Sequence, residues 1–236
     1  LAQFGYASTV DYLHAAAKRV ATETGLLPHL NPGVLSSEDY AKLRPVSASM
    51  GIMLESISNR LSQPGGPHYG SPDKDPKVRL AAIEAAGRAN VPLTTGLLIG
   101  IGETRRERLL ALLAINANHR RHGHIQEVII QNFRAKQDTL MSQYPEPDDD
   151  ELLWTIAIAR LVLDVDISVQ VPPNLNPNLL TQIIDAGIND WGGVSPVTLD
   201  HVNPEAPWPH LTELRNQTQH KGKQLVERLT LYPQFI

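Results

Sequence analysis

The chain has 236 residues, of which 42% are hydrophobic, and its 21 basic and 25 acidic side chains give a formal net charge of −4. This length and balance predict one globular domain over residues 1–236, without the basic surface that nucleic-acid binding requires and without an apolar run that could cross a membrane. A cytoplasmic location is expected, because the sequence does not open with a basic and then apolar signal segment. The sequence contains no cysteine, which excludes disulfides, thiolate nucleophiles and cysteine-bound metals or clusters within these residues.

Strand and helix patterns alternate along the chain. Residues 9–24 have the apolar spacing of a helix, which Gly25 should end. Six strand-then-helix units follow. The predicted strands are 26–31, 47–56, 91–100, 125–133, 167–171 and 191–197, and the helices after them are 36–43, 75–89, 104–119, 148–163, 177–186 and 210–228. Six regularly spaced units favour a parallel α/β sheet closed into a barrel over an open sheet.

Polar residues late in these strands, or just after them, are the candidate site residues, because such barrels bind ligands at the carboxyl ends of their strands. The candidates are His29, Asn31, Asn132, Gln170, Asn174, Asp190, Ser195 and Asp200. The last three belong to residues 189–209, where hydrogen-bonding side chains are mixed with two tryptophans, glycines and prolines. That mixture exceeds what a turn needs and predicts a polar ligand site. A rigid surface loop that caps the core is the alternative.

Residues 94–104 end the third predicted strand and contain Gly96, Gly100 and Gly102. Glycines at the end of a strand allow a flat or bulky ligand to approach the backbone closely, and the following helix start favours negative charge. The alternative is an ordinary turn from strand to helix.

Eight short motifs carry a family resemblance over the whole chain. They lie at 25–33, 49–56, 64–69, 74–80, 94–104, 131–136, 171–175 and 189–209. In this order they resemble the radical S-adenosylmethionine enzymes, and within them the synthases that close the ring of 7,8-didemethyl-8-hydroxy-5-deazariboflavin (FO). The resemblance implies a (β/α) barrel of the TIM-like, radical S-adenosylmethionine type.

The resemblance also implies the chemistry and two cofactors, S-adenosylmethionine and a [4Fe–4S] cluster. In this family the cluster cleaves S-adenosylmethionine to a 5′-deoxyadenosyl radical that abstracts hydrogen from the substrate. The implied substrate is the deazaflavin precursor 5-amino-5-(4-hydroxybenzyl)-6-(D-ribitylimino)-5,6-dihydrouracil, which cyclises to FO with loss of ammonia. The companion synthase, which transfers the hydroxybenzyl group, is the implied protein partner.

Site roles follow from the same resemblance. Glu55 matches a carboxylate that contacts S-adenosylmethionine through ribose hydroxyls or the amino group. Arg79 matches the arginine that pairs with the methionine carboxylate, with a surface salt bridge as the alternative. The adenine would pack on Gly96, Gly100, Gly102 and Ile130.

The substrate carries a uracil, a phenol and a ribityl chain, so amide and hydroxyl partners suit it. We therefore expect the eight strand-end candidates named above to form the substrate shell, although each could instead cap a helix or hold a loop. His201 could accept a proton during ammonia loss, because an imidazole titrates near neutrality. Its alternative role is a loop hydrogen bond.

The chain departs from the family pattern in one respect. The C-x-x-x-C-x-x-C motif that holds the cluster is absent. We therefore expect a fragment of about six βα units that lacks the first two units of the barrel and is short at its C-terminal end. Such a fragment would be inactive by itself. Three alternatives remain open: the companion synthase, an aminofutalosine-type radical enzyme, and a barrel that binds a ligand without catalysis.

Overall fold

The sheet has five parallel strands in the order β1 to β5 in the computed structural model, which describes residues 4–195 and 197–235. The strands are β1 (His29–Leu30), β2 (Ser49–Gly51), β3 (Leu93–Ile99), β4 (Ile125–Asn132) and β5 (Ser168–Gln170). Strand order equals chain order, as predicted for consecutive βα units. The sheet is open, so the fold is an incomplete α/β barrel.

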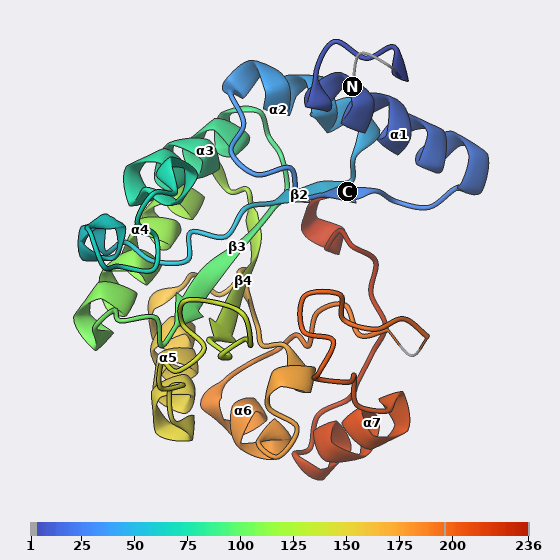
Figure 1. Ribbon diagram of the computed structural model, residues 1–236. Coiled ribbons are helices and arrows are strands. Elements are labelled where there is room, and N and C mark those ends of the chain that lie inside the picture. The colour runs from blue at the N-terminus through green and yellow to red at the C-terminus, as the bar shows by residue number, and fades with distance from the viewer. Residues whose placement is uncertain (1–3, 196, 236) are drawn as a thin grey trace.

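Among the described residues, seven α-helices accompany the sheet. They are α1 (Thr9–Thr24), α2 (Ser37–Leu43), α3 (Pro76–Arg88), α4 (Arg105–His122), α5 (Asp149–Val162), α6 (Leu180–Ala186) and α7 (Leu211–His220). Short 3₁₀ turns lie at Arg44–Val46, Asn59–Ser62, Pro72–Lys74, Pro173–Leu175 and Pro233–Phe235. Helices α2 to α6 form an arc along the outer side of the sheet, and the C-terminal segment returns on the inner side toward β2 (Figure 1). Within the described residues, no helix is long and apolar enough to cross a membrane.

Local capping signals explain where several helices begin and end. Ser36 caps α2 and Thr104 caps α4, each in a reciprocal capping box with the residue three positions later. Gly25 ends α1 and Gly123 ends α4, both with a left-handed backbone that costs glycine little. These ends agree with the sequence prediction to within a few residues.

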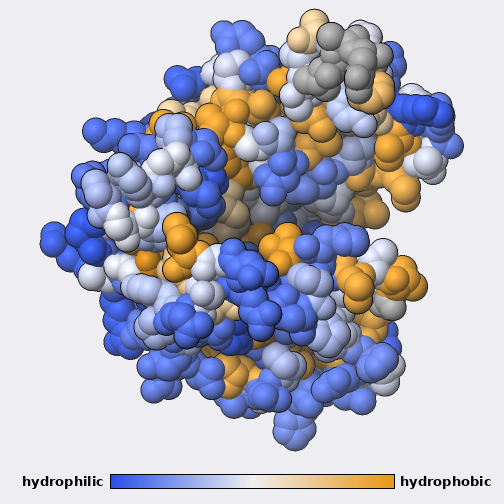
Figure 2. Space-filling model, in the orientation of Figure 1, coloured by the Kyte–Doolittle hydropathy of each residue, from blue (hydrophilic) through white to orange (hydrophobic). Residues whose placement is uncertain are grey.

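The hydrophobic core lies between the sheet and its arc of helices. Met50, Leu97 and Ile130 come from the sheet, and Ile83 and Leu112 from the helices, and all are at most 1% exposed. Alternate strand residues therefore face the helices, while their neighbours face the inner side of the sheet. Seen in space-filling form, the molecule is hollowed near the middle of the face shown in Figure 2.

The sixth predicted strand, at 191–197, is wrong for the residues that the structure describes; Pro196 lies outside them. Only an isolated bridge, Gln170 to Asp190, extends the sheet at this edge. Gly192 has a left-handed backbone (φ 73°), and the Ser195 hydroxyl accepts the Thr198 amide in a local turn, so the extended conformation does not continue.

The last predicted helix, 210–228, is also too long. α7 ends at His220, and Gly222 follows with φ 68°. Residues 221–235 instead run along the inner side of the sheet. Their Thr230 carbonyl accepts hydrogen bonds from Ser49 of β2 (3.2 Å) and Gln126 of β4 (3.1 Å). The C-terminal segment thus ties separate strands together.

Candidate functional site

The inner face of the sheet carries polar side chains at two levels, one near the start of the strands and one near their carboxyl ends. Glu127 and Gln131 of β4 share this face, because strand residues alternate sides. Glu127 lies in register with Thr94 of β3, near the start of both strands. Gln170 of β5 lies in register with Ile129, nearer the carboxyl end. A lower and an upper polar layer therefore exist.

The lower layer is an ion cluster, here called the floor cluster, made of Glu127, Asp190, Arg228 and Tyr232. The Arg228 guanidinium donates to Glu127 Oε2 (2.7 Å) and to Asp190 Oδ2 (2.5 Å). Tyr232 donates to Asp190 Oδ2 (2.5 Å), and Thr94 donates to Glu127 Oε1 (2.6 Å). Each carboxylate thus has donors within the cluster, which leaves the floor cluster internally closed.

Burial and charge act together on the floor cluster. Burial raises the pKa of the Glu127 carboxyl. Burial works against the charge of Arg228, but Asp190 and Glu127 outweigh it and raise the pKa of the guanidinium. Burial and the Asp190 charge raise the pKa of the Tyr232 hydroxyl. Arg228 is therefore the cation that compensates two carboxylates.

The upper layer contains a hollow of about 170 Å³, here called the mouth pocket. It lies beyond the carboxyl ends of β4 and β5 and is covered by the loop that follows Asp190. Its walls are Gln131, Gln170, Pro172, Leu175, Trp191, Gly193, Asp200, Val202, Asn203 and Trp208. Parallel barrels place their ligands at this end of the strands.

Polar groups around the mouth pocket are only partly paired. Asp200 accepts from Asn174 Nδ2 and Asn203 Nδ2, both at 2.9 Å. Burial would raise the Asp200 pKa, but these hydrogen bonds lower it, so the carboxylate stays ionised. The Asn174 Oδ1 and the Trp208 indole N–H are buried without a partner among the described residues.

A second charged group surrounds Glu55, just beyond β2. Lys74 Nζ lies 2.8 Å from both Glu55 oxygens, His68 Nε2 lies 3.0 Å from Oε2, and Arg79 Nη1 lies 3.5 Å from Oε1. Burial alone would raise the Glu55 pKa, but the hydrogen bonds from His68 and Lys74, with the charges of Lys74 and Arg79, lower it to about 2. Arg79 also donates to the Met53 carbonyl (2.6 Å). Two cations thus face one carboxylate.

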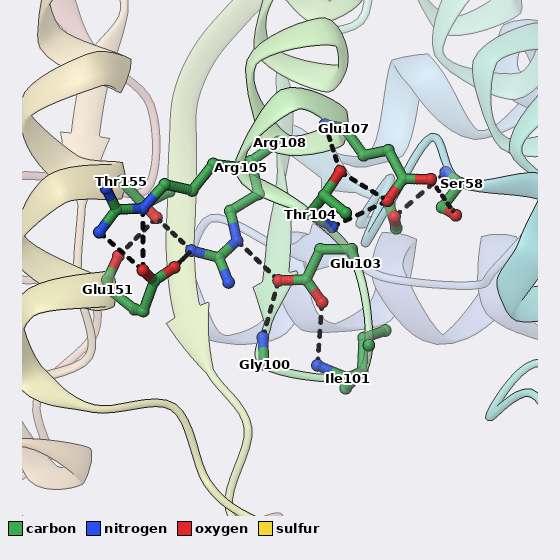
Figure 3. Close-up of polar contacts among 12 residues, drawn as sticks. Ser58, Gly100, Ile101, Glu103, Thr104, Arg105, Glu107, Arg108, Glu151 and Thr155 are labelled. Carbon is green, nitrogen blue, oxygen red and sulfur yellow. Dashed lines mark hydrogen bonds and ion pairs between the residues drawn. The ribbon is translucent and has the colours of Figure 1, made fainter.

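The turn from β3 to α4 is held by the Glu103 carboxylate (Figure 3). Its oxygens accept the backbone amides of Gly100 (2.8 Å) and Ile101 (2.9 Å), and Arg108 Nε donates to it at 2.7 Å. Arg108 also pairs with Glu151 of α5. An internal carboxylate therefore already binds the backbone amides of the turn that precedes α4.

No protein-family model matches the chain. It is 51% identical over 236 residues to the 7,8-didemethyl-8-hydroxy-5-deazariboflavin synthase of Methanopyrus kandleri, covering all of the chain and 70% of that protein. The chain belongs to this synthase family. It is also 56% identical over 234 residues to the FO synthase of Nocardia farcinica, covering 98% of the chain but 27% of that protein. The chain thus spans about a quarter of the longer FO synthase relatives.

A solved structure supports the fold of the family. The crystal structure of methylornithine synthase aligns over 95% of this chain and 66% of that one with a TM-score of 0.67, at 15% sequence identity. At this identity the likeness concerns the fold alone. It agrees with the incomplete α/β barrel described above.

The synthase-family resemblance predicted eight substrate-shell residues, and the structure gathers only some of them. Gln170 and Asp200 line the mouth pocket, and Asn174 bonds Asp200 directly. His29 and Asn31 are exposed at the β1 end of the sheet, where His29 Nδ1 lies 2.7 Å from Ser49 Oγ. These two lie outside the pocket lining.

The other predicted polar residues have structural partners. Asn132 exchanges amide hydrogen bonds with Asn176 (2.9 and 3.1 Å), and Asp190 belongs to the floor cluster. Ser195 holds a local turn, as described above. His201, the predicted proton acceptor, is exposed and is not part of the pocket lining.

The predicted adenine contacts also acquire structural roles. Ile130 is fully buried against the helices, so its side chain is directed away from the inner face; this differs from the expected ligand contact. A Cβ on Gly96 would lie 2.2 Å from the Ile129 carbonyl, and Gly100 and Gly102 adopt φ of 89° and 110°. Strand contact and turn geometry are therefore sufficient reasons for these glycines, and their predicted adenine contact stays a prediction.

Sequence reasoning missed Glu127, Arg228 and Tyr232 as well as His68 and Lys74. The position of Glu127 could have indicated a buried ion pair, because an acidic residue inside an otherwise apolar strand needs a partner. The partner is 101 residues away, in a segment predicted to be helical. Lys74 lies in a family motif, but no local pattern connects it to Glu55.

Proposed function

We propose that the chain forms the substrate-holding part of an FO synthase, which cyclises the deazaflavin precursor with loss of ammonia. The observation that carries the proposal is the 51% identity across all 236 residues to a synthase of which the chain spans 70%. The mouth pocket supports the proposal, because this pocket lies at the carboxyl ends of parallel strands, where barrel enzymes bind and convert their substrates.

The group around Glu55 has the chemistry to hold S-adenosylmethionine. The methionine part of this cofactor carries one ammonium and one carboxylate, and the group offers a carboxylate beside the cations Lys74 and Arg79. When bound, the cofactor supplies the hydrogen-abstracting radical chemistry. Glu55 would accept the ammonium or ribose hydroxyls, and Lys74 would turn from Glu55 toward the carboxylate. Arg79 would keep its backbone contacts and add to the positive field.

The [4Fe–4S] cluster does not fit the residues of this chain. Thiolate ligands are needed for such a cluster, and none of the 236 residues is cysteine. The cluster ligands would therefore come from polypeptide outside this sequence.

The mouth pocket and its surroundings would hold the precursor. Gln170, Asn174 and Asp200 offer amide and carboxylate partners at the pocket. His201 remains a proposed proton acceptor, reached only if the loop that carries it turns inward. His29 and Asn31, at the other edge of the sheet, would contact a more distant part of the substrate.

The proposed protein partner is the companion hydroxybenzyl-transferring synthase. The FO synthase relatives are long enough to contain much more than this chain, since it covers 27% of the Nocardia protein. Size-exclusion chromatography of the two full-length proteins, separate and mixed, tests the association. A common elution peak supports it, and two unchanged peaks contradict it.

The activity test uses the full-length protein, reconstituted without oxygen. We expect FO, identified by its fluorescence and mass, to form from the precursor and S-adenosylmethionine. Failure to form FO, with product from the substrates of the companion synthase or of an aminofutalosine-type enzyme, would assign the chain to that reaction instead. Binding of the precursor without any product would indicate a ligand-binding barrel.

A further inference from the structure

We infer that the mouth pocket is a subsite for a single six-membered cyclic imide ring of the pyrimidinedione class. The inference rests on the proposed function and assigns one part of the substrate to one place. The other two parts of the precursor, its phenol and its ribityl chain, would lie outside the pocket.

Size is the first argument. The hollow measures about 170 Å³, and a protein cavity of about 150 Å³ is known to accept one benzene molecule. The mouth pocket therefore has about the volume that one six-membered ring needs. The walls suit a flat ring, since Trp191 and Trp208 line the pocket together with Pro172 and Leu175.

Unpaired polar groups are the second argument. The carboxamides of Gln131 and Gln170 line the mouth pocket and make no side-chain hydrogen bond to another described residue, so they are open to whatever occupies it. The Trp208 indole N–H lacks a described partner as well. Buried polar groups in folded proteins are normally hydrogen-bonded, so the buried indole N–H indicates a ligand that supplies its missing partner. The two carboxamides are available to the same ligand.

The chemistry of those groups selects the ring. A carboxamide offers donors and an acceptor side by side, and Asp200 adds acceptor oxygens. A cyclic imide presents carbonyl acceptors on either side of an N–H donor, which matches this set. A phenol offers one hydroxyl only, and so makes fewer hydrogen bonds than the two carboxamides and Asp200 together can accept and donate. A polyol could bond the amides but would not use the flat apolar walls.

The backbone of the covering loop holds Gln170 in place. A Cβ on Gly192 would lie 2.1 Å from Gln170 Nε2, so this carboxamide packs directly over a glycine with a left-handed backbone (φ 73°). The close approach limits where the Gln170 side chain can go. The carboxamide is therefore positioned before any ligand arrives.

The test measures ring binding in the full-length protein by tryptophan fluorescence, with uracil, 4-methylphenol and ribitol as separate probes. We expect uracil to bind at least fivefold more tightly than the other two, and 3-methyluracil to bind more weakly because its imide N–H is blocked. Gln131→Leu and Gln170→Leu should each weaken uracil binding at least fivefold, about the effect of one lost hydrogen bond. Gln182→Leu, on the exposed side of α6, is the matched control and should bind uracil as the parent does.

Three outcomes overturn the assignment: uracil binding no tighter than 4-methylphenol or ribitol, unchanged affinity in both glutamine variants, or competitive displacement of uracil by S-adenosylmethionine. The last would make the pocket an adenine site. The measurement needs neither the cluster nor turnover, so failure to form FO leaves it standing. Loss of ring binding in a protein that forms FO would remove only the pocket assignment.

Discussion

The floor cluster and the mouth pocket lie on the same inner face of the sheet, yet they differ in whether their polar groups bond to one another. In the floor cluster, Arg228 pairs with both Glu127 and Asp190, and Tyr232 adds a hydrogen bond to Asp190. In the mouth pocket, the carboxamides of Gln131 and Gln170 face the hollow, and the Trp208 indole N–H is buried without a partner among the described residues. Groups that satisfy one another stabilise the fold, while a buried donor left without a partner lowers its stability, and this contrast is the reason for proposing a ligand at the mouth pocket.

The largest expected effect comes from breaking the floor cluster. Arg228→Ala leaves two carboxylates on the inner face without their cation, and should lower the free energy of unfolding by about 3–5 kcal/mol. Urea denaturation measures the loss. Arg19→Ala is the control, because the pair of Arg19 with Glu23 is exposed and should contribute nothing measurable. Equal stability of the two variants would show that the cluster is not closed as described.

If ion pairs hold Glu55 as they hold the carboxylates of the floor cluster, the free energy of unfolding should depend on pH. The pKa of Glu55 falls from 4.5 in the unfolded chain to about 2 in the folded protein, so the unfolded state binds more protons between these values. The contribution of Glu55, roughly 3 kcal/mol, is therefore complete above pH 4.5 and is lost as the pH falls toward 2. We expect the difference in unfolding free energy between the parent and Glu55→Gln to shrink from pH 6 to pH 3. A constant difference contradicts the ion pairing.

The β3–α4 turn should behave like the floor cluster, with a smaller effect. Glu103→Ala removes the acceptor for two backbone amides and one partner of Arg108, which keeps Glu151. We expect a loss of about 2 kcal/mol by chemical denaturation. Glu227→Ala, at an exposed position without a described partner, is the control. A loss no larger than in the control would mean that the turn does not need its internal carboxylate.

The smallest expected effect on stability comes from alanine substitutions in the loop that covers the mouth pocket. Gly192→Ala places a Cβ against Gln170 at a left-handed position and should cost about 1–2 kcal/mol, while Gly193→Ala meets no atom within 4 Å. Thermal melting separates the two variants. Uracil affinity should fall only in Gly192→Ala, and equal behaviour of both alanine variants would indicate that Gln170 is not held by the loop.

Much of the architecture was predictable because its causes are local. Apolar periodicity and capping residues such as Ser36 and Thr104 located the helices, and their order implied a parallel sheet. The sixth strand and the long final helix were wrong, since Gly192 and Gly222 adopt left-handed conformations that the apolar pattern did not reveal. Of the eight substrate-shell candidates, Gln170 and Asp200 line the mouth pocket, while Asn132 and Asp190 pair with other side chains.

The sequence by itself determined the order of strands and helices, the polar character of the strand ends and the absence of cysteine ligands. Each of these depends on residue identity and on neighbours a few positions away. Only the tertiary structure decided which polar groups neutralise one another, because ion pairing depends on distance through space and on burial. Arg228 meets Asp190 from 38 positions away and Glu127 from 101. That pairing assigns Asp190 to the fold and leaves the carboxamides of Gln131 and Gln170 for a ligand.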